Sequence, residues 1–406
     1  MTGFKAVVAA ELEAAGKLLV QDGNHGEYRP RPSEFSDVGT SFIRAADMAN
    51  GRLLFDKAER INETALQRIR KGIGKPQDVI LSHKGTVGKV AFADADCEPF
   101  VCSPQTTFWR SLDHEVIDPR YLFFAIRSPG FISQLRTIEN ETDMAAYVPL
   151  TQQRRLQLSV PPIAEQRKIA SILGVLDDKI AVNDRIARTI DDLSNALFEE
   201  ATILCPRVSL ADTANPVLGA TPDRTVSHYW GGTVPWASAK DVANSSFGVI
   251  ATTEERITED AAQTTRAKPV PPGSVVLTAR GTVGAVARVI NLSSFNQSCY
   301  AFTPGQIPPG VLFHLIRAAS DRMLNIAHGT VFSTVNMKTF SHVAVPSISD
   351  AQLPALEGKL APLHRGIEHR LLESMTLRNL RDTLLPELMS GRLRMRDVEK
   401  IVEETV

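Results

Sequence analysis

Cysteine is scarce in this chain, with four residues among 406, at Cys97, Cys102, Cys205 and Cys299. They are too few and too scattered to form a disulfide scaffold. Cys97 and Cys102 also lack the second pair, or the nearby histidine, that would complete a zinc site. We therefore expect these thiols to be core or surface residues in a reducing cytoplasm.

Long apolar runs are absent as well. No run reaches the roughly 18 residues that a membrane-spanning helix needs. Glu11 and Glu13 interrupt the apolar N-terminal stretch, which excludes a secretory signal. Hydrophobic residues make up 43% of the chain and charged residues 22%, as in ordinary soluble proteins, and the length suits two or three domains. The chain is predicted to be cytoplasmic, with no membrane partner.

An excess of either charge is also missing, because the formal net charge is −1. This balance argues neither for nor against a nucleic-acid partner. A DNA-binding protein with such a balance must place its basic residues on one face, away from its acidic ones.

The common catalytic motifs are not found. The sequence contains no Gly-x-Gly-x-x-Gly fingerprint, no His-Glu-x-x-His zinc helix and no Gly-x-Ser-x-Gly elbow. Asp177 and Asp178 lie in a helical stretch, where adjacent carboxylates are more often a solvated face than an acid/base pair. No catalytic residue and no metal ligand is predicted.

The stretch from Val160 to Ile203 predicts one long helix. Pro161 and Pro162 suit its start, and Gly174 is the only glycine or proline after them. Asn183 stands where an apolar residue is expected, which costs stability but sets the register with a partner helix. Such a helix is about 60 Å long. Its apolar seam has a 4-3-4 spacing and comprises Ile169, Leu173, Leu176, Ile180, Ala187, Ile190 and Leu197.

A second long helix is predicted from Asp350 to Met389, with Gly391 as a left-handed stop. Its register matches that of the first helix, because Leu173, Leu176 and Ile180 fall 187 positions before Leu360, Leu363 and Ile367. The two helices are predicted to pack on each other. Two unrelated amphipathic helices, each packed on its own domain, are the alternative. The second seam comprises Leu356, Leu360, Leu363, Ile367, Leu377, Leu384 and Leu388.

Residues 207–345 repeat the order of motifs in residues 17–160. Residues 81–91 recur 196 positions later, with Gly-Thr-Val-Gly identical and a basic residue, Lys84 or Arg280, before it. Residues 42–50 parallel residues 236–244, and Gln105 and Gln297 are predicted to be equivalent. The shared order indicates a tandem duplication of a globular part plus a long helix.

The Gly-Thr-Val-Gly stretch predicts a tight hairpin turn. It does not fit the Walker pattern, because Val90 and Ala91 continue a strand and Ala285 replaces Lys89 in the second copy. Lys84 and Arg280 are either solvated surface charges or DNA contacts.

Three groups of residues resemble a known family. They are Pro-Pro-Ile-Ala-Glu-Gln-Arg at 161–167 with the positions up to Asn183, then Gly219–Pro222 with residues 229–241, and residues 384–393. Together they resemble type I restriction–modification specificity (S) subunits over essentially the whole chain.

This resemblance implies an α+β fold with a pseudo-two-fold internal repeat. Two tandem α/β target-recognition domains, 1–160 and 207–346, would be separated by two long helices packed as an antiparallel coiled coil. The helices would occupy 161–206 and 347–406, the latter including a C-terminal tail. The expected helix-seam residues are Leu173, Leu176, Ile180, Asn183, Leu360, Leu363 and Ile367.

The resemblance also implies a function. Such a subunit reads an asymmetric, bipartite site in double-stranded DNA and docks two methyltransferase (M) subunits, which restriction (R) subunits join. It performs no chemistry and binds no cofactor, because S-adenosylmethionine, ATP and Mg²⁺ belong to the partners. Ser349–Gln352 depart from the Ala-Glu-Gln-Arg pattern of the first helix, so the partner contacts of the two helices are expected to differ.

Physical argument supports a bipartite reader, because two unlike domains contact two half-sites whose centres lie about 34 Å apart on one face of a duplex. Arginine and lysine position each domain on phosphates, and polar side chains read base edges. The predicted DNA contacts are Arg44, Lys84, Lys240 and Arg280, with Gln105 and Gln297 as base or structural residues.

Two other functions compete with this interpretation. A fused methyltransferase or nuclease would need an Asn/Asp-Pro-Pro-Tyr/Phe motif or an acidic metal-binding cluster, and neither is seen. A coiled-coil adaptor that binds only protein would not retain DNA in a sequence-selective way.

Overall fold

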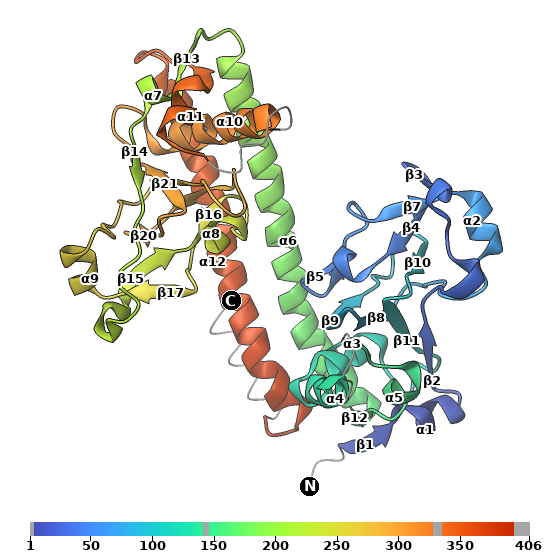
Figure 1. Ribbon diagram of the computed structural model, residues 1–406. Helices are drawn as coiled ribbons and strands as arrows, with labels where there is room; N and C mark the ends of the chain where they lie inside the picture. The colour runs from blue at the N-terminus through green and yellow to red at the C-terminus, as the bar shows by residue number, and fades with distance from the viewer. Residues whose placement is uncertain (1–3, 141–145, 328–334, 394–406) are drawn as a thin grey trace. The chain divides into compact units, whose positions relative to one another are not determined.

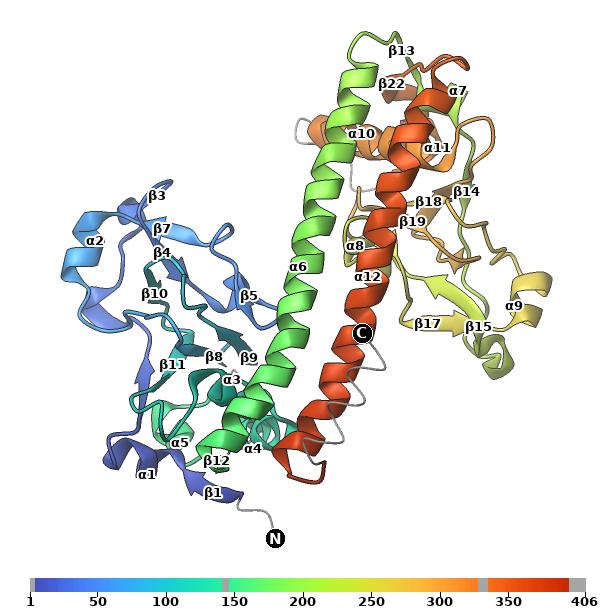
Figure 2. The ribbon, with the colours of Figure 1, turned by 180° about the vertical axis from the view of Figure 1, so that it is seen from behind.

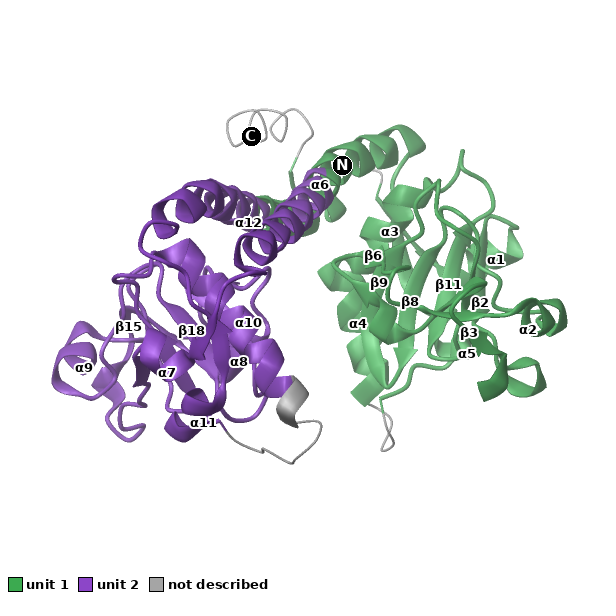
Figure 3. Ribbon diagram, turned by 90° about the horizontal axis from the view of Figure 1, so that it is seen from above, with its two compact units in different colours: residues 1–178, 377–406 green, residues 179–376 purple. Residues whose placement is uncertain are grey.

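The computed structural model describes residues 4–140, 146–327 and 335–393 (Figure 1). The chain forms two compact units, coloured separately in Figure 3: residues 1–178 with 377–406, and residues 179–376. We call them unit 1 and unit 2. The predicted C-terminal tail beyond residue 393 lies outside the described residues.

Unit 1 contains a six-stranded and a four-stranded sheet. The larger has the order β2(Leu18–Asp22), β11(Thr106–Ser111), β8(Val79–Lys84), β9(Thr86–Phe92), β6(Arg52–Leu53), β5(Met48–Ala49). The smaller has the order β10(Phe100–Cys102), β4(Thr40–Ile43), β7(Glu59–Ile61), β3(Phe35–Ser36). The strand predicted through Val90 and Ala91 is β9, so this prediction is confirmed.

Two helices cover the larger sheet of unit 1. Neighbouring residues of a strand point to opposite faces, so on β11 Phe108 joins the core with Ile80 while Trp109 meets the helical side. There its ring lies 5.5 Å from Phe131, edge to face. The two helices are α3(Pro119–Arg127) and α4(Pro129–Asn140). Pro129 separates them, because proline disfavours helical conformation in the preceding residue.

Unit 2 repeats this plan. Its larger sheet has the order β14(Pro216–Leu218), β21(Cys299–Phe302), β18(Val275–Thr278), β19(Val286–Val289), β16(Val249–Ile250). The smaller has the order β17(Glu255–Ile257), β15(Trp230–Ala237), β20(Ser294–Phe295). Strand β18 lies between β19 and β21 as β8 lies between β9 and β11. Helix α10(Pro309–Ala327) packs on β18 and β19. The predicted tandem duplication is therefore confirmed.

One part of the repeat escaped the sequence analysis. Strands β7 and β17 both read Glu-Arg-Ile, and each leads into a short helix, α2(Glu63–Arg68) or α9(Glu259–Thr264). Asn62 caps the first helix by accepting from the Ala65 N–H, and Thr258 caps the second by accepting from the Ala261 N–H. The two small sheets are thus equivalent residue by residue at this strand.

Both predicted long helices are present as α6(Ile163–Thr202), of 40 residues, and α12(Leu353–Met389), of 37 residues. Gly391 has φ +68°, so the predicted left-handed stop after α12 is confirmed. Each unit contains a segment of both helices, and Figure 2 shows these segments running alongside each other. In unit 2 they pack antiparallel, since Asn183 bonds Glu373 while Ile190 meets Gly366.

Burial along both helices follows a 3-4 spacing. On α6 the buried residues that follow this spacing are Gln166, Ile169, Leu173, Leu176, Ile180, Asn183, Ala187, Asp191, Ser194 and Phe198, and Ala170, Gly174 and Thr202 are buried as well. The predicted seam residues Ile190 and Leu197 are half-buried and give way to their neighbours Asp191 and Phe198. On α12, Leu360 and Ile367 are buried, whereas Leu363 is half-buried beside the buried His364. A period of 3.6 residues drifts from a strict heptad, which explains these one-residue shifts.

The Nδ2 of the buried Asn183 amide finds a partner, whereas its Oδ1 has none among the described residues. Its Nδ2 donates to Glu373 Oε2 over 2.8 Å, and Lys179 Nζ lies 3.2 Å from Glu373 Oε1. The three side chains tie α6 to α12 within unit 2. Because Asn183 is buried, a shifted pairing of the helices would leave its amide without this partner.

Asp177 and Asp178 anchor α6 in unit 1. Asp177 accepts from Arg127 Nη1 of α3 at 2.9 Å and from Arg381 Nη1 of α12 at 2.5 Å. Asp178 accepts from Arg120 at 2.6 Å and from Arg52 at 3.3 Å. The side chain of Asp177 is 12% exposed and that of Asp178 is 50% exposed. The expectation of a solvated face is therefore wrong for Asp177, because the arginines that reach it come from distant parts of the chain.

Two buried histidines join α10 to α12 in unit 2. His314 Nε2 and His364 Nε2 are 3.0 Å apart, and Phe198 stacks on His314 with ring centroids 5.4 Å apart. Burial, with the cations of Arg317 and Arg288 nearby, lowers the pKa of His314 to about 3 and that of His364 to about 2. Both rings are neutral, so one donates to the other.

We expect Asp177→Asn to lower the free energy of unfolding by about 3 kcal/mol, because it leaves buried guanidinium charge without its carboxylate. The matched control is Asp178→Asn on the half-exposed neighbour, which should cost about 1 kcal/mol or less. Urea denaturation followed by circular dichroism measures both. Equal losses for the two variants would contradict the assignment of Asp177 as the anchor.

We expect stability to fall as the pH drops from 6.5 towards 3. The unfolded histidines bind protons in that range while His314 and His364 stay neutral in the folded chain. The loss should approach about 1.4 kcal/mol per pH unit for each histidine. The double variant His314→Gln/His364→Gln should flatten the slope of unfolding free energy against pH, whereas replacing the exposed His228 should not. An unchanged slope in the double variant would refute this explanation.

Candidate nucleic-acid interface

Three of the predicted contact residues meet at one pocket of unit 1. Arg44, Lys84 and Gln105 line a cavity of about 470 Å³. The remaining lining residues are Arg29, Pro30, Phe35, Phe42, Gly85, Ser103 and Pro104. We call this cavity the unit 1 pocket. The structure thus brings together residues that lie more than 60 positions apart in the sequence.

The unit 1 pocket combines an aromatic wall with a basic rim. Phe35 and Phe42 pack edge to face with centroids 5.8 Å apart. Lys84 is exposed, with its Nζ 5.8 Å from the centre of the Tyr147 ring, and the Gln105 side chain is also exposed. Cations for phosphates, an amide for base edges and an apolar surface for bases or methyl groups are the groups that nucleic-acid recognition uses.

Arg44 is held in place by two carboxylates. Its Nη1 lies 2.8 Å from Glu59 Oε2 and its Nε lies 3.3 Å from Asp47 Oδ2. Asp47 also accepts from the Arg44 backbone N–H at 2.9 Å, which closes the turn after β4. The guanidinium is therefore oriented rather than free to sample many rotamers.

The two glycines of the Gly-Thr-Val-Gly turn have nearly the same φ in both units. Gly85 and Gly88 have φ of +78° and +90°, and Gly281 and Gly284 have +77° and +90°. At the end of each preceding strand a hydroxyl oxygen accepts from the far side of the turn. Ser82 Oγ accepts from the Lys89 N–H at 2.9 Å, and Thr278 Oγ1 from the Ala285 N–H at 2.8 Å. The predicted hairpin turn is confirmed, and it holds Lys84 and Arg280 exposed at equivalent positions.

The predicted contact residues of unit 2 do not share a described pocket as those of unit 1 do, and Lys240 and Gln297 bond different residues. Lys240 Nζ lies 2.9 Å from Glu254 Oε2, and this hydrogen bond raises the pKa of Lys240. Gln297 accepts a hydrogen bond from Thr221, and Arg280 is exposed. Lys240 occupies the position of Ala46 in the repeat, so it is not the counterpart of Arg44.

The predicted equivalence of Gln105 and Gln297 is wrong by one residue. The Gln105 carbonyl accepts from the His83 N–H, and the matching bond from the Ala279 N–H goes to Ser298. The segment between β18 and β21 is three residues shorter than its counterpart between β8 and β11, whereas pairing Gln105 with Gln297 would require four. Gln297 therefore corresponds to Pro104.

A cluster that the sequence analysis missed lies on the smaller sheet of unit 2. Trp230 pairs with Ile257 as Phe35 pairs with Ile61. Trp230 and Trp236 pack edge to face, with ring centroids 5.2 Å apart. Over both rings lies the Arg224 guanidinium, 3.8 Å from the centre of Trp230 and 5.2 Å from that of Trp236. The repeat of Glu-Arg-Ile was the signal that could have led to this cluster.

Glu255 holds Arg224 on this aromatic pair. It accepts from Nη2 at 2.8 Å and from Nη1 in a second hydrogen bond. These bonds lower the pKa of Glu255, so it stays ionised near neutral pH. Glu255 is the counterpart of Glu59, which holds Arg44 in unit 1. In both units the same glutamate therefore orients an arginine, but the arginine comes from a different loop.

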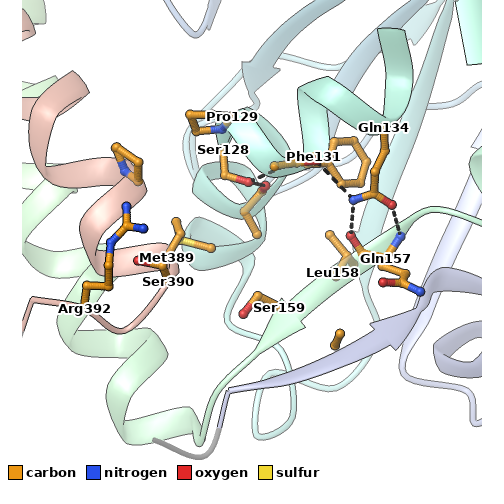
Figure 4. Close-up of a pocket in the computed structure, with 14 residues that line it drawn as sticks. Ser128, Pro129, Phe131, Gln134, Gln157, Leu158, Ser159, Met389, Ser390 and Arg392 are labelled. Atoms are coloured by element: carbon orange, nitrogen blue, oxygen red, sulfur yellow. Dashed lines mark hydrogen bonds between the residues drawn. The ribbon is translucent and has the colours of Figure 1, made fainter. Parts of the chain in front are cut away.

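Other features of the described chain show no catalytic arrangement. A pocket of about 380 Å³ lies where α4 and β12(Gln157–Val160) meet the end of α12 in unit 1 (Figure 4). Gln134 bridges to the Gln157 backbone there, and Arg392 is the one charged residue of the lining. Among residues 4–140, 146–327 and 335–393, no group of three potential metal ligands is found. In the same ranges no helix is long and apolar enough to cross a membrane.

Comparison with known proteins gives consistent matches. The family described as "Type I restriction modification DNA specificity domain" matches residues 24–191 and 208–350. The HindI specificity subunit of Haemophilus influenzae is 21% identical over 438 residues, covering 87% of this chain and 94% of that protein. The MjaIX specificity subunit of Methanocaldococcus jannaschii is 30% identical over 131 residues, or 32% of this chain and 30% of that protein.

A solved structure shares the fold. The type I restriction–modification S subunit from M. genitalium superimposes with a TM-score of 0.57 at 15% identity, covering 95% of this chain and 96% of that one.

We expect Gly85→Ala to lower the free energy of unfolding by about 1 kcal/mol, because an L-residue is strained at φ +78° although no atom lies within 4 Å of the added methyl. Gly130→Ala in α4 is the matched control. Its site is equally open without a positive φ, so its stability should be unchanged or slightly raised. Thermal unfolding of both variants measures the difference, and equal stabilities would refute the strain.

Proposed function

The chain belongs to the family of type I restriction–modification DNA specificity domains and is a specificity subunit; we propose that unit 1 reads one half of a bipartite DNA target and unit 2 the other. The observation that carries this proposal is the pair of equivalent small sheets. Each carries an aromatic pair and an arginine fixed by a glutamate, and in unit 1 these share one pocket with Lys84 of the glycine turn. The side chains at the equivalent positions differ, so the two half-sites differ in sequence.

Unit 1 supports the proposal with a pocket of suitable chemistry. Lys84 and Arg29 at the rim would neutralise phosphates, and Gln105 and Arg44 would face base edges. Unit 2 would use Arg280 on the equivalent turn for a phosphate, with Lys240 and Gln297 nearby on the same domain. A chain with no net excess of basic residues needs such local clustering to bind DNA.

We also propose that the long helices dock the partner subunits. Val182 and Leu193 on α6 and Leu372 on α12, all in unit 2, are 45–49% exposed, so apolar side chains also lie outside the buried faces of the two helices. Two methyltransferase subunits would bind there, and restriction subunits would join them. S-adenosylmethionine, ATP and Mg²⁺ would be bound by those partners, in the cytoplasm.

Methylome sequencing of cells with and without this chain tests the proposal. One bipartite methylated motif should vanish on deletion and return on complementation. Retention of every motif would refute the proposal. Methylation by the purified chain with S-adenosylmethionine alone would favour the fused enzyme, and absence of sequence-selective DNA retention with the methyltransferase present would favour the protein adaptor.

We expect Lys84→Ala to weaken binding of the chain–methyltransferase complex to all duplexes alike, and to reduce the slope of log K against log salt by about 1, because one phosphate contact is lost. Lys5→Ala is the control, since Lys5 is an exposed lysine of unit 1 on β1(Lys5–Val8), outside the two larger sheets. Fluorescence anisotropy across salt concentrations measures both. A slope unchanged by Lys84→Ala would contradict the phosphate contact.

A further inference from the structure

We propose that Arg224 is a specificity-determining residue that reads a guanine in the half-site contacted by unit 2. The inference rests on the proposed DNA-reading function and names one chemical contact within it. What carries it is the juxtaposition of Arg224, the two tryptophans and Glu255, which together make a rigid, outward-facing guanidinium.

The two tryptophan rings that Arg224 covers also fix the loop that carries Arg224, through hydrogen bonds from their Nε1–H groups. Trp236 Nε1 donates to the Ala220 carbonyl at 3.0 Å, and Trp230 Nε1 donates to the Asp223 carbonyl at 3.3 Å. Asp223 Oδ1 also accepts from the Thr225 N–H at 2.9 Å. The backbone on both sides of Arg224 is therefore clamped, and the side chain loses little further freedom when it binds a ligand.

The guanidinium keeps donors available for a ligand. Arginine has five N–H groups, and the hydrogen bonds to Glu255 use one on each Nη. Nε–H and the remaining Nη2–H lie along one edge of the planar group, and no described residue is seen to occupy them. The side chain of Arg224 is 54% exposed, so about half of it is open to solvent.

Two parallel donors on a fixed plane match guanine better than the other bases. In the major groove guanine presents two acceptors, O6 and N7, whereas adenine presents an acceptor and a donor. A lone phosphate contact would not need this degree of fixation, since a flexible lysine supplies it. The glutamate that holds Arg224 would also repel a misplaced phosphate, which favours a base edge over the DNA backbone.

In unit 1 the equivalent glutamate also holds an arginine, but that arginine lies at a different position in the repeat. Glu59 holds Arg44, which stands at the place of Ser238 in the repeat, whereas Arg224 comes from the loop before β15. The same glutamate of the repeat thus orients an arginine in both units, although a different loop supplies the arginine in each. This would let two similar domains require different bases, or the same base at different positions.

The test uses the complete complex of this chain with its methyltransferase partner. Arg224→Lys keeps the charge but removes the planar fork, and should relax the requirement for one G·C pair in the unit 2 half of the motif by about 10-fold to 100-fold. The unit 1 half should stay unchanged. Arg224→Gln should shift preference at that position towards adenine. Methylome sequencing and competition binding to duplexes substituted at each position measure both.

Arg256→Lys is the matched control, because Arg256 is the exposed arginine next to Glu255 on β17 and bonds the Thr233 carbonyl instead. It should leave the motif intact. Uniform weakening on all duplexes by Arg224→Lys would mean a phosphate contact and would overturn the inference, as would an unchanged motif. Absence of any motif that depends on the wild-type chain would overturn the proposed function itself, so the two failures are distinguishable.

Discussion

Burial of one stripe along each of two long helices is the constraint on which the rest of this structure depends. Helices α6 and α12 are too one-sided to stand alone, and each unit completes its core with a segment of both. In unit 2 the core includes Phe198 from α6 and Leu353, Leu356 and Leu360 from α12. Neither unit is therefore formed by its sheets alone, and the proposed readers are built onto the helices.

Polar groups within the helix contacts give the pairing its specificity. An apolar seam tolerates sliding, because one leucine fills a hole much like another, whereas Asn183 must meet Glu373 and Asp177 must meet Arg127 and Arg381. Buried ion pairs add little net stability but are costly to break. The paired histidines act likewise between α10 and α12. These contacts select one register rather than strengthen the fold.

The two copies share the residues that maintain the domain shape and differ in the side chains proposed to read DNA. Hydroxyls, positive-φ glycines and the Glu-Arg-Ile strand recur at equivalent positions, so they maintain the shape of each domain. The side chains carried by that framework differ: Phe35 and Phe42 line an open pocket in unit 1, whereas Trp230 and Trp236 are covered by Arg224 in unit 2. On this framework, the proposed specificity can change through new side chains on the loops, without a new fold.

The sequence by itself determined the two long helices, the tandem repeat and the glycine turns, because these depend on local periodicity and on backbone preferences within a few residues. It also placed Arg44, Lys84 and Gln105 on the candidate list. Only the tertiary structure decided that these three share a pocket, that Ser298 rather than Gln297 matches Gln105, and that Asp177 is an anchor. The physical reason is that each of these features depends on contacts between segments that are distant in the sequence. The support of Arg224 by Glu255 depends on such a contact too. The residues next to each partner in the sequence carry no signal of these contacts.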